Sequence, residues 1–127
     1  MIEEGVMRVN RIAGLVFGAA LLSVPSLVSA ADAPAAFTLC KACHSVDAGK
    51  NGVGPSLAGV FGRKAGTMSG FKFSDPHIKS GLTWDEPTLT KYLADPKTVI
   101  PGNKMVFAGL KSPDEIKSVI EYLKTLK

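Results

Sequence analysis

The sequence predicts an all-α fold in which a few helices are joined by long loops. Residues 112–127 combine helix-start signals with apolar residues at helical spacing, and no stretch alternates apolar and polar residues like a half-buried strand. Residues 45–81 are rich in glycine with only scattered apolar side chains, which is typical of loops and turns. Because the chain has 127 residues, we expect a single small domain.

The first thirty residues are predicted to be a cleaved signal peptide, which leaves residues 31–127 as the domain. Arg8 and Arg11 form a basic start, an uncharged stretch follows, and Val28-Ser29-Ala30 supplies the small residues that signal peptidase prefers. Cleavage is expected after Ala30 or Ala31, with export to the periplasm. An uncleaved membrane anchor is the alternative, because about 20 apolar residues can span a bilayer. Glycine, proline and serine residues in the stretch disfavour the anchor.

Two helices are expected before the last one. Residues 31–39 are short and apolar, with Pro34 suited to a first helical turn, and are expected to run helically into the cysteines. Residues 83–86, with the sequence T-W-D-E, resemble a capping box, and the helix that they open should end before Asp95-Pro96. Residues 100–110 contain proline and two glycines and are expected to form an extended loop.

The last helix has the clearest signals. Ser112 is a typical N-cap, Pro113 suits the first helical position, and the acidic residues 114–115 favour the positive helix end. Four apolar residues at i, i+3, i+4 and i+7 predict its buried face: Ile116, Val119, Ile120 and Leu123.

The segment Cys40-Lys41-Ala42-Cys43-His44 carries the chemistry of the chain. C-x-x-C-H is the attachment pattern of c-type haem. On a helix, Cys40 and Cys43 share one face and can reach two vinyl groups on one porphyrin edge, while His44 turns its imidazole to the iron. A haem would also explain residues 45–81, because a long loop without a core of its own is unusual in a compact domain.

Three other interpretations of the cysteine pair remain. A structural zinc site needs four ligands, and His77 is the only other histidine, at a poor spacing. A thioredoxin-like dithiol is expected in a βαβ context, for which the sequence has no signal. A plain disulfide between the two cysteines is the third.

Met105 is the candidate for a second iron ligand. It lies in P-G-N-K-M-V-F, a loop fixed by proline and flanked by apolar residues. A thioether opposite an imidazole favours ferrous iron and raises the reduction potential, which suits electron transport. The alternative for such a methionine is core packing. Met68 is the other methionine of the predicted domain.

Taken together, the motifs resemble class I c-type cytochromes, particularly the mitochondrial-like soluble carriers of bacteria. The resemblance covers residues 37–127 and rests on C-K-A-C-H, G-V-G-P-S-L-A-G-V-F-G-R-K-A-G, S-G-L-T-W-D-E, Y-L-A-D-P-K and P-G-N-K-M-V-F-A-G-L-K. It implies a small cytochrome c helical bundle with long loops wrapped around one covalent haem c and its iron. It also implies a one-electron carrier between respiratory or photosynthetic redox partners, and not an enzyme. A haem peroxidase or gas-binding protein in which the methionine ligand dissociates is the alternative.

The same resemblance implies roles for individual residues. Cys40 and Cys43 would anchor the haem, and His44 and Met105 would be the axial ligands of the iron. The carbonyl of Pro55 would accept the other ring N–H of His44 and so fix its tautomer.

Three further side chains are implied in haem binding. Arg63 and Trp84 would hydrogen-bond a buried propionate, whose charge is costly in an apolar pocket. Tyr92 would approach the sulfur of Met105. Their alternatives are a solvated surface charge for Arg63 and ordinary core packing for Trp84 and Tyr92.

The sequence departs from the family pattern at four points. Phe73 stands where tyrosine is common, His77 where asparagine is usual, and Asn103 replaces a common threonine near the distal ligand. The segment before Cys40 is shorter than the usual first helix, so Phe37 or Ala36 has to make its contact with the last helix.

The charge of the chain bears on its partners. The formal net charge is +4 and no basic run indicates nucleic acid. In the family, lysines ring an exposed haem edge and dock on acidic surfaces of redox proteins. Lys97, Lys104 and Lys111 bracket the Met105 loop and are the candidates here, with ordinary solvated lysines as the alternative. A monomer is expected.

Overall fold

The computed structural model describes Gly14, Gly18 and residues 32–127. The predicted signal peptide therefore lies outside the described residues, apart from its two glycines. Among the described residues, no helix has the length and apolar character needed to cross a membrane.

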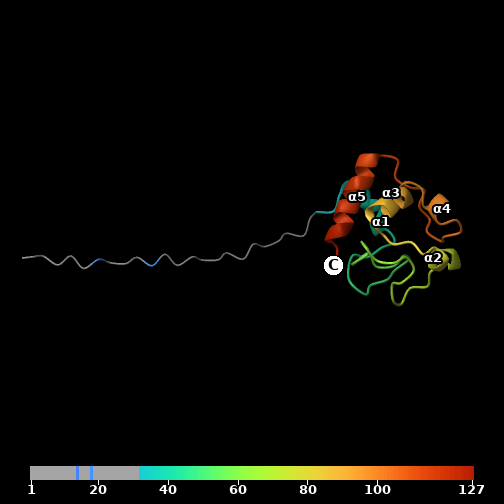
Figure 1. Ribbon diagram of the computed structural model, residues 1–127, viewed down its shortest axis with the longest axis horizontal. Coiled ribbons are helices and arrows are strands. Elements are labelled where there is room, and N and C mark those ends of the chain that lie inside the picture. The colour runs from blue at the N-terminus through green and yellow to red at the C-terminus, as the bar shows by residue number, and fades with distance from the viewer. Residues whose placement is uncertain (1–13, 15–17, 19–31) are drawn as a thin grey trace, which may run out of the picture.

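The described part of the chain is helical, as predicted. It contains a 3₁₀ turn η1 (Ala35–Phe37) and the helices α1 (Thr38–Lys41), α2 (Asp75–Lys79), α3 (Glu86–Ala94), α4 (Pro96–Val99) and α5 (Pro113–Thr125). The one β feature of residues 32–127 is an isolated antiparallel bridge between Lys64 and Thr83. In Figure 1, α5 lies beside α3, and the long loop between α1 and α2 fills the lower part of the domain.

Helix α5 begins where the sequence predicts. The Ser112 hydroxyl accepts a hydrogen bond from the Glu115 amide at 3.4 Å, and Pro113 is the first helical residue. The predicted apolar face is buried in full, namely Ile116, Val119, Ile120 and Leu123. Because α5 packs on both α3 and η1, this face forms the centre of the core.

Helix α3 begins later than the predicted capping box. Asp85 is the N-cap, and its carboxylate accepts the Thr88 amide at 2.9 Å. Thr83 pairs with Lys64 instead of capping. The prediction placed the cap two residues early. Thr83 and Glu86 have the spacing of a capping box, but Asp85 between them is also a favourable N-cap residue. The helix ends at Ala94, before Asp95-Pro96, as predicted.

Two short helices were not predicted. Helix α2 is capped by the Ser74 hydroxyl, and α4 by the Asp95 carboxylate, which accepts the Thr98 amide at 3.3 Å. Each has a proline in its first turn, at Pro76 and Pro96. Both were missed because four or five residues are too few for an apolar period to show.

The short segment before the cysteines contacts the last helix through one aromatic pair. Phe37 is fully buried, and its ring meets Tyr122 edge-on at a centroid distance of 4.6 Å. Of the two residues considered for this contact, Phe37 makes it. An edge-to-face pair of this kind contributes about 0.5–1.5 kcal/mol beyond its buried area.

Gly109 lies at a tight crossing between the Met105 loop and α3. Its φ is +107°, and a Cβ there would collide with the Ala94 carbonyl. We expect Gly109→Ala to lower the free energy of unfolding of the holoprotein by about 2–3 kcal/mol, measured by chemical denaturation. Gly59→Ala is the control, because Gly59 also has a positive φ of +67° but a Cβ there would have no neighbour within 4 Å. Equal losses in the two variants would contradict the steric account.

Candidate haem site

One cavity of about 480 Å³ lies between the cysteine motif, the long loop, α3 and the Met105 loop. Its volume lies in the range of about 300–1,000 Å³ that is usual for ligand pockets. All eight predicted site residues line it: Cys40, Cys43, His44, Pro55, Arg63, Trp84, Tyr92 and Met105. The remaining wall is largely apolar and includes Phe37, Leu57, Val60, Leu89, Leu93, Phe107, Val119 and Leu123. The fold therefore gathers residues from positions 37 to 123 around one space.

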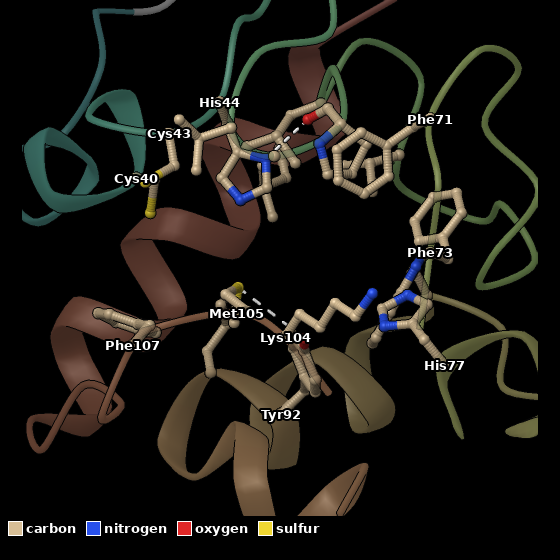
Figure 2. Close-up of a pocket in the computed structure, with 18 of the residues that line it drawn as sticks. Cys40, Cys43, His44, Phe71, Phe73, His77, Tyr92, Lys104, Met105 and Phe107 are labelled. Carbon is tan, nitrogen blue, oxygen red and sulfur yellow. Dashed lines mark hydrogen bonds between the residues drawn. The ribbon is translucent and has the colours of Figure 1, made fainter. Parts of the chain in front are cut away.

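The two cysteines and His44 enter the cavity from one helical turn. The amides of Cys43 and His44 both donate to the Cys40 carbonyl, at 3.2 and 2.9 Å, which closes a turn directly after α1. In Figure 2, both sulfurs lie at the same edge of the cavity. Both thiols are free in the described structure, and burial raises the pKa of the Cys40 thiol. This placement suits attachment to one edge of a planar group.

His44 is held in a defined orientation. Its Nδ1 lies 2.6 Å from the Pro55 carbonyl oxygen, so Nδ1 carries the proton and donates. Nε2 is then the unprotonated nitrogen and is free to bind a metal. Sequence reasoning linked Pro55 to His44 through family resemblance, and the structure brings the two groups within hydrogen-bond distance.

Met105 faces His44 across the cavity. Figure 2 shows the methionine sulfur and the imidazole ring on opposite walls, with open space between them. The Tyr92 hydroxyl donates to the Met105 sulfur at 3.9 Å. Burial raises the pKa of Tyr92 to about 12, so the hydroxyl keeps its proton at neutral pH. Met68 is not among the residues that line the cavity.

Arg63 gives the wall of the cavity a positive charge. Its guanidinium donates to the carbonyls of Ala58 at 3.0 Å and Ser56 at 3.2 Å. No carboxylate pairs with it among the described residues. Burial lowers the pKa of Arg63, although an arginine remains charged in proteins. Trp84 is buried and also lines the cavity, with its ring 4.6 Å from that of Tyr92. A cation and an indole N–H donor here suit an anionic substituent of the cofactor.

Helix α2 brings an aromatic group to the far end of the cavity. The His77 ring stacks on Phe73 at 4.9 Å with an interplanar angle of 21°, and Phe73 also meets Phe71 edge-on. Burial lowers the pKa of His77, which favours its neutral form. Figure 2 shows His77 far from the cysteines, which does not suit a shared zinc site. Sequence reasoning noted Phe73 and His77 as departures but had no signal for their stacking.

Gly54 is a site residue that sequence reasoning missed, although it lies in the quoted G-V-G-P motif. A Cβ at Gly54 would lie 2.5 Å from Cε1 and 2.8 Å from Nδ1 of His44. The close approach of this backbone to the imidazole therefore requires glycine.

Gly54→Ala is expected to displace the His44 ring and weaken its bond to Pro55. We expect a loss of about 1–3 kcal/mol in the free energy of unfolding. The absorption bands of low-spin haem should also lose intensity. Gly52→Ala is the matched control, because its Cβ would meet the Cys43 carbonyl at an ordinary 3.5 Å. A normal spectrum in the Gly54 variant would contradict this role.

Comparison with known proteins assigns the chain to a family. The profile described as Cytochrome c matches residues 30–127. The chain belongs to the cytochrome c family. The resemblance inferred from the motifs is thereby confirmed, as is the small all-α fold.

The sequence of this chain is similar to those of its relatives along nearly the whole described domain. Cytochrome c2 iso-2 of Magnetospirillum molischianum is 92% identical over 97 residues, which are 76% of this chain and 100% of the relative. Cytochrome c2 of Rhodoplanes tepidamans is 63% identical over 97 residues, which are 76% of this chain and 99% of the relative. The structure of cytochrome cH from Methylobacterium extorquens matches with a TM-score of 0.67 and 55% identity, over 71% of this chain and 91% of that one.

Membership of the family establishes the cofactor and the class of function. The chain carries one covalent c-type haem with its iron, and it is an electron carrier that works with redox partners and not an enzyme. The cavity fits that cofactor, because two thiols at one edge, an imidazole facing a thioether and a cationic wall lie around one apolar space.

Proposed function

We propose that the haem is attached through Cys40 and Cys43, that His44 and Met105 are its axial ligands, and that this site passes single electrons between redox proteins. The observation that carries the proposal is the placement of the His44 ring and the Met105 sulfur on opposite walls of one cavity, with the cysteines at its edge. When bound, the haem supplies an iron that alternates between the ferrous and ferric states.

The residues around the cavity suit transfer without rearrangement. His44 is fixed by its 2.6 Å contact with Pro55, and the Met105 sulfur is approached by the Tyr92 hydroxyl at 3.9 Å. Two protein ligands leave no open position for a substrate, which favours a carrier over a haem peroxidase or gas-binding protein. Arg63 and Trp84 are proposed to bind a propionate and offset its charge.

Redox titration of the holoprotein tests this function. We expect a single one-electron transition, and no rapid binding of carbon monoxide by the reduced protein at neutral pH, because Met105 would hold the iron where carbon monoxide would have to bind. Rapid binding of carbon monoxide would favour a site whose methionine dissociates, as in the peroxidase or gas-binding alternative.

The proposed domain is residues 31–127, acting in the periplasm after removal of the signal peptide. Cleavage after Ala30 leaves 97 residues, counted as 127 − 30. The relative from Magnetospirillum molischianum is matched along its whole length by 97 residues, which supports this boundary. We propose that the mature protein acts as a monomer.

Lysines at the Met105 loop are proposed to dock acidic redox partners. Lys97, Lys104 and Lys111 are all exposed. Lys97 also donates to the Asn103 carbonyl at 2.8 Å, so it stabilises the Met105 loop as well. Val106 is 97% exposed beside them and adds an apolar contact to the basic surface. Such a surface steers an acidic partner to the reactive edge.

Lys104→Glu is expected to slow oxidation of the reduced protein by ferricyanide several-fold at low salt, because it reverses a charge beside the site. The wild-type rate should also fall as salt shortens the Debye length from about 30 Å at 0.01 M to about 10 Å at 0.1 M. Lys117→Glu makes the same charge change on the exposed surface of α5 and is the control. Equal rates in the two variants would contradict docking through the Met105 loop.

A further inference from the structure

Asn103 lies two residues before the proposed iron ligand and is almost completely buried, with 5% of its surface exposed. We propose that Asn103 is a positioning residue, which ties the main chain of Met105 to α4 and so holds the sulfur at the iron. The proposal rests on the ligation of iron by Met105 put forward above.

The amide nitrogen of Asn103 joins the loop to both ends of α4. Nδ2 donates to the Pro96 carbonyl at 2.9 Å and to the Ile100 carbonyl at 2.8 Å. Pro96 is the first residue of α4, and Ile100 is its C-cap. Helix α4 in turn packs on α3, which carries Tyr92. The side chain is therefore anchored on a helix that packs on α3, which lines the cavity through Leu89, Tyr92 and Leu93.

The amide oxygen of Asn103 binds the main chain of Met105, the proposed iron ligand. Oδ1 accepts the backbone N–H of Met105 at 3.0 Å. Within residues 104–109, all of which the structure describes, no other backbone N–H donates to a protein atom. The next anchor along the chain is the Leu110 amide, which donates to the Leu93 carbonyl at 2.7 Å. Between these two anchors, Asn103 provides the hydrogen bond that directly restrains the Met105 backbone.

An asparagine suits this position better than the threonine common in the family. The three contacts require two N–H donors and one acceptor on a single side chain. A carboxamide supplies both donors from its NH₂ group and accepts through its oxygen. A hydroxyl has one donor, so it cannot serve both carbonyls at once. The Lys97 ammonium adds a contact to the Asn103 carbonyl at 2.8 Å and fixes the same residue from outside.

Imidazole binding to the oxidised holoprotein tests the proposal, because imidazole competes with Met105 for the iron. Asn103→Leu removes all three side-chain hydrogen bonds at similar volume, and we expect imidazole affinity to rise at least about tenfold, as for the loss of one net hydrogen bond or more. Asn103→Ser keeps a small polar group and is expected to give a smaller rise. If Asn103→Leu does not yield holoprotein, Asn103→Ser decides: a rise in imidazole affinity that the control variant does not show supports the proposal, and an unchanged affinity overturns it.

Ser112→Ala is the control for loss of stability. The Ser112 hydroxyl caps α5 by accepting the Glu115 amide at 3.4 Å, and removing such a cap costs about 0.5–2 kcal/mol in the free energy of unfolding. Ser112 does not line the haem cavity, so its loss should change imidazole affinity by less than about twofold, whatever it does to unfolding.

Three results are informative. A rise confined to the Asn103 variants supports the proposal. Unchanged affinity in them, or an equal rise in Ser112→Ala, overturns it and leaves Asn103 a general structural residue. If the wild type shows no sulfur-to-iron charge-transfer band, the Met105 ligation itself fails, and this failure is visible before any variant is made.

Discussion

Replacing Cys40 and Cys43 together by alanine is expected to give a chain without haem that is largely unfolded. The haem cavity is bordered by core residues of α3 and α5, which would face water without the cofactor. A domain of this size buries only about 60–70% of its unfolded surface and has little stability to spare. Intact mass should equal that of the apo chain, and the far-ultraviolet circular dichroism should show little helix.

The wild-type protein is the reference for this variant. Its mass should exceed that of the apo chain by one haem, and its colour should survive denaturation and acid-acetone extraction. Expression without the maturation machinery should reproduce the double variant, since residues 45–81 would again lack a partner to pack on. A folded double variant, or haem that extracts freely from the native protein, would contradict covalent attachment at these cysteines.

Met105→Ala is expected to abolish the sulfur-to-iron charge-transfer band and to lower the reduction potential. The thioether favours ferrous iron, so its loss should shift the potential down by on the order of 0.1–0.3 V, a part of the roughly 0.8 V that axial ligands span. The optical spectrum and a redox titration measure the two effects.

Met68→Ala is the control for this prediction, because Met68 does not line the cavity. It should leave both the band and the potential unchanged. Survival of the band in Met105→Ala would move the ligand role to Met68. A bis-imidazole spectrum of the wild type would instead implicate His77.

The sequence was most informative where a local pattern directly determines structure. The cap and apolar face of α5 were predicted because Ser112, Pro113 and the i, i+3, i+4, i+7 spacing act within one helix. The C-x-x-C-H motif likewise lies within one helical turn. Helix α2 was not predicted, because it has only five residues, which begin at the Ser74 cap and carry no apolar period.

Contacts between distant segments limited the prediction of the site. Family resemblance named Pro55 and Tyr92, and the structure places them beside His44 and Met105. The contact of Gly54 with the imidazole depends on how the long loop returns to the haem motif, which no local pattern encodes. The bonds from Asn103 to α4 depend in the same way on the fold of the Met105 loop.

The absorption spectra of the oxidised and reduced holoprotein at neutral pH test the central claim most directly, namely that His44 and Met105 bind the iron from opposite walls of the cavity. The account predicts low-spin haem c in both states, with a sulfur-to-iron charge-transfer band in the oxidised protein. A high-spin spectrum, or a low-spin spectrum without that band, would contradict it.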